Sequence, residues 1–133
     1  MPSLSVFVVD DHHAIREGLG DLVTGTDGLD VWGTAESGDD ALAQLEATGA
    51  AGATRDGGPD VVVTDVRMPG MDGIALVGAI RARWPALPCV VFSAQLSQAY
   101  AVQALAAGAA GYVEKGNLAG LIEAVFRAGS GAG

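Results

Sequence analysis

The chain has 133 residues, a length that suggests one domain with a buried core, and half of its residues are hydrophobic, which excludes a disordered chain. Sixteen acidic residues against seven basic ones give a formal net charge of −9, which disfavours direct binding to nucleic acid and favours a cation wherever the acids converge. No apolar run approaches the roughly 20 residues of a membrane span, and the single cysteine, Cys89, cannot form an internal disulfide. The composition therefore favours a cytoplasmic globular domain without a membrane segment.

Strand and helix patterns alternate along the whole chain. The expected strands are apolar or β-branched runs at residues 4–9, 29–35, 61–64, 88–92 and 111–113. Each is followed by apolar residues at helical spacing, around residues 15–23, 41–45, 74–84, 97–107 and 118–125. Five strands alternating with five helices predict an α/β fold, in which helices cover both faces of a parallel sheet. We also expect an exposed, mobile loop at residues 49–58, and one domain over residues 1–128 followed by a linker or tail at 129–133.

The sequence is organised around one stretch, residues 61–73. Its β-branched run is typical of a strand buried on both faces, and Asp65 follows this strand directly, before a loop that contains Pro69 and Gly70. Asp65 is therefore expected at the carboxyl end of a central strand, where open α/β sheets bind their ligands. Taken alone, the same aspartate is equally compatible with the start of a turn or a helix cap.

Polar side chains accompany the ends of three other predicted strands. Asp10 and Asp11 follow the first strand, Ser93 follows the fourth, and Lys115, the only lysine of the chain, comes just after the fifth. Because the carboxyl ends of parallel strands meet at one edge of the sheet, these residues and Asp65 predict a single site.

Three carboxylates at one edge predict a cation site. Like charges at close range cost stability unless a cation neutralises them, and hard oxygen ligands suit Mg²⁺. Zinc is disfavoured because no Cys/His cluster accompanies the acids. His12 and His13 adjoin the acids, but consecutive side chains point apart after a strand-to-helix turn, so we expect both histidines to be solvated or to cap the helix rather than to bind the metal. A carboxylate beside Mg²⁺ can accept a phosphoryl group whose charge is met by the metal, Ser93 and Lys115.

Four motifs resemble, in their order, the receiver domain of bacterial two-component response regulators, over residues 3–128. They are Val-Val-Asp-Asp at 8–11, Asp-Val-Arg-Met-Pro-Gly-Met-Asp-Gly at 65–73, Phe-Ser-Ala at 92–94 and Gly-Ala-Ala-Gly-Tyr-Val-Glu-Lys at 108–115. The stretch at 10–19 is similar to the LuxR/NarL/FixJ-like subfamily, whose members usually carry a C-terminal helix-turn-helix. The resemblance implies a flavodoxin-like, doubly wound (βα)5 fold with a five-stranded parallel sheet in the order 2-1-3-4-5.

The resemblance also implies how the acids work. Asp65 would be the phosphoacceptor. Mg²⁺ would be bound by Asp11, by Asp65 and by the backbone carbonyl of Arg67, and Asp10 would hold the metal through water.

Three further residues are implied as parts of the switch. Ser93 would bond to a phosphoryl oxygen, Lys115 would pair with the phosphoryl group, and Tyr112 would move inward as Ser93 is drawn toward it. The surface of the fourth helix, fifth strand and fifth helix would then change and serve a homodimer or an effector domain.

The same resemblance implies the partners. The phosphodonor would be a sensor histidine kinase, and DNA would be contacted only through a helix-turn-helix domain that this chain does not contain. The receiver would not be an enzyme beyond catalysing its own phosphorylation and dephosphorylation.

Three alternatives stay open. A receiver-like module that never accepts phosphate would keep the fold and work through interactions alone. An aspartyl-phosphate phosphatase of the haloacid-dehalogenase type needs a second acid two residues after the nucleophile, where this chain has Arg67. A flavodoxin-like electron carrier needs a phosphate cradle after the first strand, where Asp10 and Asp11 would repel the FMN phosphate.

Overall fold

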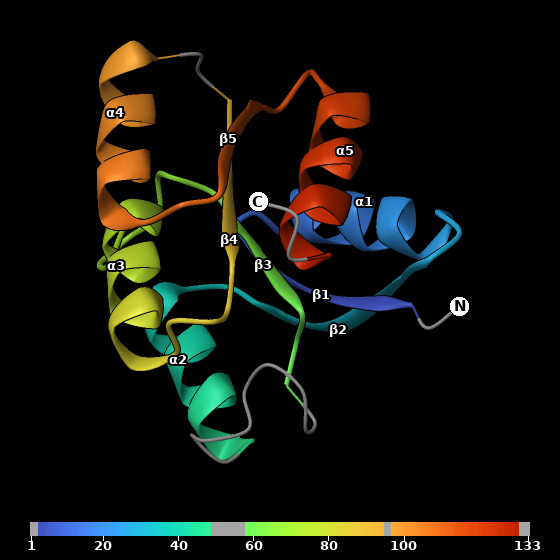
Figure 1. The fold of residues 1–133 in the computed structure, drawn as a ribbon, viewed down its shortest axis with the longest axis horizontal. Coiled ribbons are helices and arrows are strands. Elements are labelled where there is room, and N and C mark those ends of the chain that lie inside the picture. The colour runs from blue at the N-terminus through green and yellow to red at the C-terminus, as the bar shows by residue number, and fades with distance from the viewer. Residues whose placement is uncertain (1–2, 49–57, 95–96, 131–133) are drawn as a thin grey trace.

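A computed structural model of the chain describes residues 3–48, 58–94 and 97–130. Five parallel strands form one sheet in the order β2-β1-β3-β4-β5, and a helix follows each strand (Figure 1). The strands are β1 (Leu4–Val9), β2 (Leu29–Ala35), β3 (Val61–Thr64), β4 (Cys89–Ser93) and β5 (Gly111–Glu114). The helices are α1 (His13–Thr24), α2 (Gly38–Ala47), α3 (Gly73–Arg83), α4 (Gln98–Ala107) and α5 (Leu118–Gly129). The predicted fold class and strand order are confirmed.

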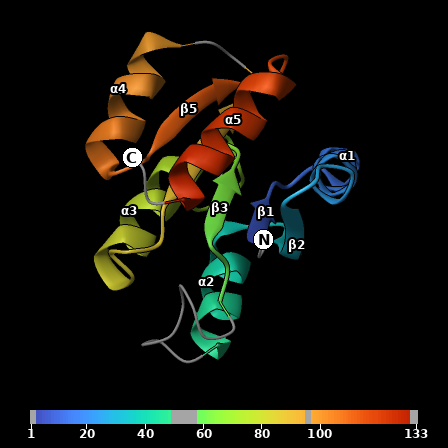
Figure 2. The same ribbon diagram turned by 45° about the vertical axis from the view of Figure 1, so that its right-hand side comes forward.

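Helices cover both faces of the sheet, and each face has its own buried core. Because side chains alternate along a strand, β1 sends Phe7 and Val9 to one core and Val6 and Val8 to the other. The first core includes buried residues of α2, α3 and α4, and the second includes buried residues of α1 and α5. Figures 1 and 2 agree with this division, with α1 and α5 on one side of the sheet and α3 and α4 on the other.

The central strand is buried on both faces, as its β-branched sequence predicts. All four residues of β3 are buried, and β3 pairs with β1 on one side and with β4 on the other. Since β3 is the middle strand of five, the residue that follows it emerges near the centre of the sheet edge.

The last helix extends further than its apolar spacing indicated. The predicted tail begins at Gly129, but α5 continues through this residue. A Cβ at Gly129 would come within 2.7 Å of the Leu4 side chain and 2.8 Å of the Val61 side chain, so this glycine lets the helix end lie close against β1 and β3. The rest of the predicted tail, residues 131–133, and the predicted mobile loop apart from Gly58 lie outside the described residues.

No helix in the described parts of the chain is long and apolar enough to cross a membrane. The longest are α1 and α5, each of 12 residues.

Candidate functional site

The backbone hydrogen bonds of the sheet continue one residue beyond its strands and so position the site. The Asp65 N–H donates to the carbonyl of Val9 (3.0 Å), and the Asp10 N–H donates to the carbonyl of Ala35 (3.1 Å). At the other side of the site, the Lys115 N–H donates to the carbonyl of Ser93 (2.7 Å). The three residues are therefore held by the sheet itself, at the carboxyl ends of its strands, as predicted.

Lys115 joins the two buried acids. Its Nζ lies 3.0 Å from Asp10 Oδ2 and 3.2 Å from Asp65 Oδ2. The side chain of Asp10 is 1% exposed and that of Asp65 is 6% exposed, so neither charge is well solvated. One ammonium neutralises only one of two buried carboxylates, and a net negative charge remains at the sheet edge.

Burial raises the pKa of the Asp65 carboxyl above its ordinary value, and the neighbouring charge of Asp10 raises it further. Lys115 opposes this shift by its charge and its hydrogen bond, and so does the Val66 N–H, which donates to Asp65 Oδ1 at 2.8 Å. Ionised Asp65 therefore destabilises the folded protein relative to its protonated form. A further positive charge at the site would reduce this destabilisation.

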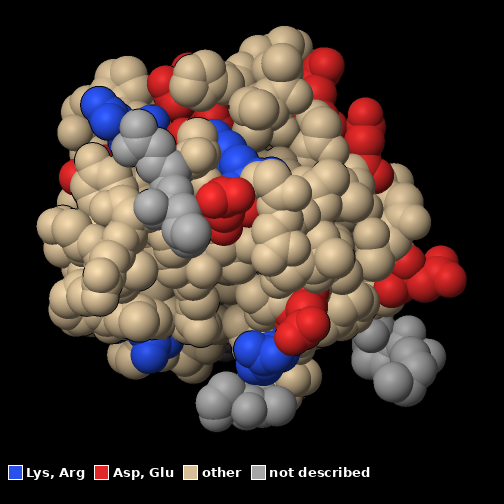
Figure 3. Space-filling model, turned by 90° about the horizontal axis from the view of Figure 1, so that it is seen from above, with Lys and Arg blue, Asp and Glu red and all other residues tan. Residues whose placement is uncertain are grey.

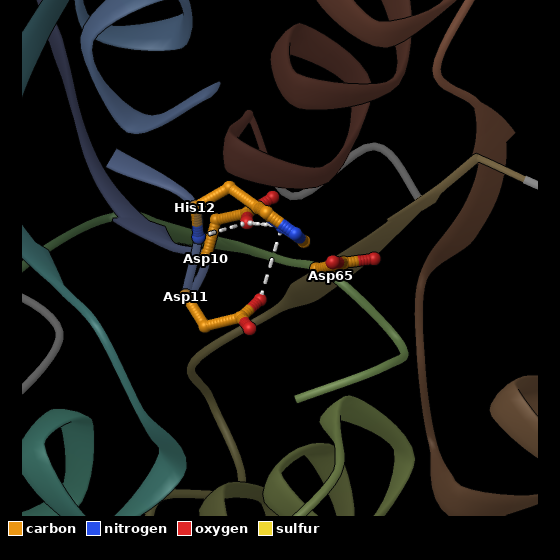
Figure 4. Close-up of side chains that lie close together, drawn as sticks. All are labelled: Asp10, Asp11, His12 and Asp65. Carbon is orange, nitrogen blue, oxygen red and sulfur yellow. Dashed lines mark hydrogen bonds and ion pairs between the residues drawn. The ribbon is translucent and has the colours of Figure 1, made fainter. Parts of the chain in front are cut away.

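The third acid, Asp11, completes a cluster that fits a divalent cation. One side-chain atom each of Asp10, Asp11, His12 and Asp65 can be chosen so that all four lie within 4.8 Å of one another (Figure 4). Asp11 Oδ1 is buried and has no hydrogen-bond partner among the described residues, although it faces this cluster. A buried carboxylate oxygen without a donor is costly unless a cation meets it, and carboxylate oxygens are the ligands that Mg²⁺ prefers. The donor set therefore fits the predicted Mg²⁺.

His12 is solvated, as expected of both histidines, but its ring also faces the acids. Its Nδ1 lies 3.2 Å from Asp10 Oδ1 and 3.2 Å from Asp11 Oδ1, while its side chain remains 64% exposed. Consecutive side chains do diverge, since His13 turns outward to Glu17 (Nε2 to Oε1, 3.1 Å), but it is His12 that faces the cluster. His12 is the N-cap residue of α1, yet its side chain makes no capping hydrogen bond.

The turn after β1 explains this position. The His12 N–H donates to Asp10 Oδ1 at 2.9 Å, an aspartate-to-backbone bond two residues along the chain that brings His12 back over Asp10. Arg16, which the sequence did not single out, supports the same turn because its Nη1 donates to the Asp10 carbonyl at 2.7 Å. The signal for the turn was present in the sequence as an aspartate at the strand end, but the Arg16 contact has no local signature.

The remaining predicted residues lie around the same edge. Ser93 ends β4 and is 2% exposed, and Arg67 is exposed in the loop that follows Asp65. Tyr112 is half-buried on β5 and packs against the core that α2, α3 and α4 cover. Seen from above, acidic side chains adjoin a basic one near the middle of this end of the molecule (Figure 3). The structure thus gathers the three acids and Lys115 directly, while the assigned roles of Ser93, Arg67 and Tyr112 stay predictions.

The chain is similar to known proteins in sequence and in fold. Residues 6–126 match the model of the response regulator receiver domain. The chain is 39% identical over 112 residues to the DNA-binding transcriptional activator DevR/DosR of Mycobacterium tuberculosis, covering 84% of this chain and 48% of that protein. It is 41% identical over 121 residues to a protein-glutamate methylesterase/protein-glutamine glutaminase of a Nocardioides species, covering 86% of this chain and 30% of that protein.

A solved structure is also similar. The two-component response regulator of the LuxR family from an Aurantimonas species superposes with a TM-score of 0.85 at 31% identity, covering 97% of this chain and 86% of that one. The chain spans about half the length of the DevR/DosR relative, and less of the methylesterase.

Proposed function

This chain belongs to the response regulator receiver domain family, and from that premise we propose that Asp65 accepts a phosphoryl group from a sensor histidine kinase. The observation that carries the proposal is the arrangement around Asp65. Its carboxylate is buried, shares Lys115 with Asp10, and lies in one cluster with Asp11, whose Oδ1 accepts no hydrogen bond from the described residues. Such a site holds more negative charge than it neutralises, and so favours the arrival of a cation.

In the proposed reaction an Asp65 carboxylate oxygen attacks the phosphorus of the donor. The bond between phosphorus and the donor's imidazole nitrogen breaks, its electron pair stays on that nitrogen, and Asp65 becomes an acyl phosphate. The Val66 N–H holds Oδ1 and Lys115 approaches Oδ2, so the carboxylate is oriented before the donor arrives. This orientation lowers the entropic cost of the attack.

The negative charge of the phosphoryl oxygens has to be stabilised by positive groups and hydrogen-bond donors at the site. Lys115 supplies one positive charge next to Asp65, at a position 17% exposed where water screens it little. Mg²⁺, held by Asp11, Asp65 and the Arg67 carbonyl and through water by Asp10, would supply two more positive charges at the phosphoryl oxygens. Ser93, at the end of the neighbouring strand, would donate its hydroxyl to one of these oxygens.

The output of the switch is proposed at α4, β5 and α5. Three large apolar side chains are exposed on these elements, Val102 and Leu105 of α4 and Leu118 of α5. Lys115 follows β5 directly and Tyr112 lies on it, so contacts made at the phosphoryl group act on this strand first. A shift of β5 and α4 that exposes or covers the apolar side chains would favour a homodimer or an effector contact.

The effector is proposed to be a DNA-binding domain, continuous with the receiver in the whole protein. The LuxR-family neighbour and the transcriptional activator DevR/DosR support this choice, although the methylesterase relative joins a similar receiver to an enzyme. The receiver itself is proposed to be a cytoplasmic signalling domain without an enzymatic substrate of its own.

The proposal is tested by intact-mass measurement after incubation with Mg²⁺ and acetyl phosphate. The wild type should gain one phosphoryl group, and Asp65→Asn should gain none. If the wild type gains nothing, a titration with beryllofluoride distinguishes the two remaining cases. Binding of this phosphoryl mimic would indicate a short-lived phosphoryl group, whereas no binding would favour a receiver that works by interaction alone.

A further inference from the structure

We propose that His12 gives this receiver a nitrogen ligand at its cation site, so that the site binds divalent transition-metal ions such as Zn²⁺ through His12 Nδ1, in competition with Mg²⁺. The inference rests on the proposed function, because the other ligands are the carboxylates of the same site. Its starting point is the position of one imidazole over two acids (Figure 4).

The distances suit a shared ion. His12 Nδ1 is 3.2 Å from Asp10 Oδ1 and 3.2 Å from Asp11 Oδ1. Ligands bound at about 2.1 Å around a tetrahedral or octahedral ion lie roughly 3.0–3.5 Å from their nearest neighbours. The imidazole nitrogen is therefore already spaced from each of the two carboxylate oxygens as one ligand is from its neighbour.

A second observation concerns Asp11. Its Oδ1 is buried and accepts no hydrogen bond from the described residues, and the 3.2 Å approach of His12 Nδ1 does not have hydrogen-bonding geometry. The His12 ring thus lies near this oxygen without satisfying it. A metal ion bound by both atoms would satisfy the oxygen, and it would replace the hydrogen-bond contact that His12 Nδ1 makes with Asp10 Oδ1 at 3.2 Å.

An ion that binds His12 does not have to displace the Lys115 ammonium from Asp10. Lys115 contacts Oδ2 of Asp10, whereas His12 contacts Oδ1 of the same carboxylate. The His12 N–H fixes the turn by its bond to Asp10 Oδ1, and the ring is 64% exposed, so an ion can reach it directly from solvent.

The added imidazole nitrogen raises the affinity of the site for some ions more than for others. Imidazole nitrogen is a good ligand for Zn²⁺, Co²⁺ and Ni²⁺, and for these ions its addition to carboxylates raises affinity. Mg²⁺ prefers oxygen and keeps several of its waters, so it gains little from the nitrogen. His12 is therefore proposed as a residue that sets metal preference, with Mg²⁺ bound by the acids and transition metals bound by the acids and His12.

His13 is the matched control. The chain has two histidines, and they are adjacent. His13 is 75% exposed and contacts Glu17 on the outer side of α1, where a His/Glu pair one turn apart offers a rival site for Zn²⁺. Substituting each histidine in turn distinguishes the two sites in otherwise identical proteins.

The test is calorimetric titration of the wild type, His12→Gln and His13→Gln with Zn²⁺ and, separately, with Mg²⁺. We expect His12→Gln to lower Zn²⁺ affinity by about tenfold or more while Mg²⁺ affinity changes less than about twofold. His13→Gln should keep the wild-type affinity for Zn²⁺, and excess Mg²⁺ should weaken Zn²⁺ binding to the wild type. In long-range ¹H–¹⁵N spectra, Zn²⁺ should shift Nδ1 of His12 and leave His13 unchanged.

Several outcomes would overturn the inference. If Mg²⁺ binds normally but His12→Gln keeps full Zn²⁺ affinity, or if only His13→Gln loses it, the proposed role of His12 is wrong and the proposed function stands. If the wild type binds neither metal, the cation site of the proposed function fails, and the inference fails with it. Retained Mg²⁺ binding by His12→Gln shows that the variant is folded.

Discussion

Gly73, the first residue of α3, lies directly against the backbone of Asp65: a Cβ at Gly73 would come within 1.8 Å of the Asp65 carbonyl oxygen. The Gly73 N–H also donates to the Val66 carbonyl at 2.8 Å. The start of α3 therefore follows the backbone of the candidate phosphoacceptor at a distance that only glycine permits.

We predict that Gly73→Ala destabilises the domain by about 2 kcal/mol or more, because a backbone atom cannot yield as a flexible side chain can. Phosphorylation should fall as well, since the displaced segment carries Asp65. The matched control is Gly78→Ala in the same helix, where an added Cβ meets nothing within 4 Å. This control should stabilise the domain by about 1 kcal/mol, as the helix propensity of alanine predicts. Urea unfolding of both variants checks the prediction, and equal effects of the two substitutions would contradict it.

Lys115→Met is predicted to separate phosphorylation from metal binding. Loss of the ammonium removes a positive charge from the phosphoryl position, and the initial rate with acetyl phosphate should fall by about a hundredfold. The same loss leaves Asp10 and Asp65 without their shared partner, so Mg²⁺ affinity should be unchanged or higher. Initial rates at saturating Mg²⁺ and calorimetric Mg²⁺ titrations give the two quantities. A parallel loss of both would indicate instead that Lys115 mainly holds the fold.

The raised pKa of Asp65 makes a prediction about stability and pH in the absence of divalent cations. A carboxyl whose pKa is higher in the folded protein than in the unfolded chain favours folding when protonated and opposes it when ionised. The ionised Asp65 carboxylate therefore lowers the stability of the folded protein at neutral pH. This destabilisation disappears as the pH falls below about 3.8, the pKa of the carboxyl in the unfolded chain. Asp65→Asn should raise the melting temperature at neutral pH, with an advantage that shrinks toward acid pH.

Two controls accompany that measurement. Asp30→Asn removes the same charge from an exposed position on β2 and corrects for the net charge of −9. Added Mg²⁺ should raise the melting temperature of the wild type more than that of Asp65→Asn, because the variant has lost a ligand. An Asp65→Asn variant that is less stable than the wild type at neutral pH without metal would show that the Lys115 contact outweighs burial.

Cys89 is predicted to be chemically inert while the domain is folded. Burial raises the pKa of its thiol to about 12, and its side chain is fully covered within the core. Since the thiolate is the reactive form, Ellman's reagent should not label the native protein at mildly alkaline pH and should label it fully in urea. Stoichiometric labelling of the native protein would contradict this assignment.

Much of the fold and the site could be predicted because both depend on local patterns. The β-branched run before Asp65 predicted a buried central strand. Parallel strands put the acids after β1 and β3 at one edge of the sheet, and the strand order implied by the family resemblance made them neighbours. The features that could not be predicted depend on contacts distant in sequence or on one side-chain rotation. The sequence predicted Lys115 at the same edge as the acids, but not that its Nζ contacts both Asp10 and Asp65, which lie 105 and 50 residues away. The end of α5 depends on the space that Leu4 and Val61 leave beside Gly129.

His12 shows the same limit at short range. The sequence placed it correctly after the strand, but the direction of its ring depends on the bond between its N–H and Asp10. That bond turns the backbone so that His12, and not His13, faces the acids.

The most direct test of the central claim is to locate the phosphoryl group chemically. The wild type is phosphorylated with acetyl phosphate and Mg²⁺, reduced with borohydride to convert an aspartyl phosphate to homoserine, and digested with trypsin. We predict homoserine at Asp65, in the peptide that follows Arg55 and ends at Arg67, and unmodified Asp56 and Asp60 in the same peptide. Homoserine at Asp60, Asp10 or Asp11 in place of Asp65 would contradict the assignment of the phosphoacceptor.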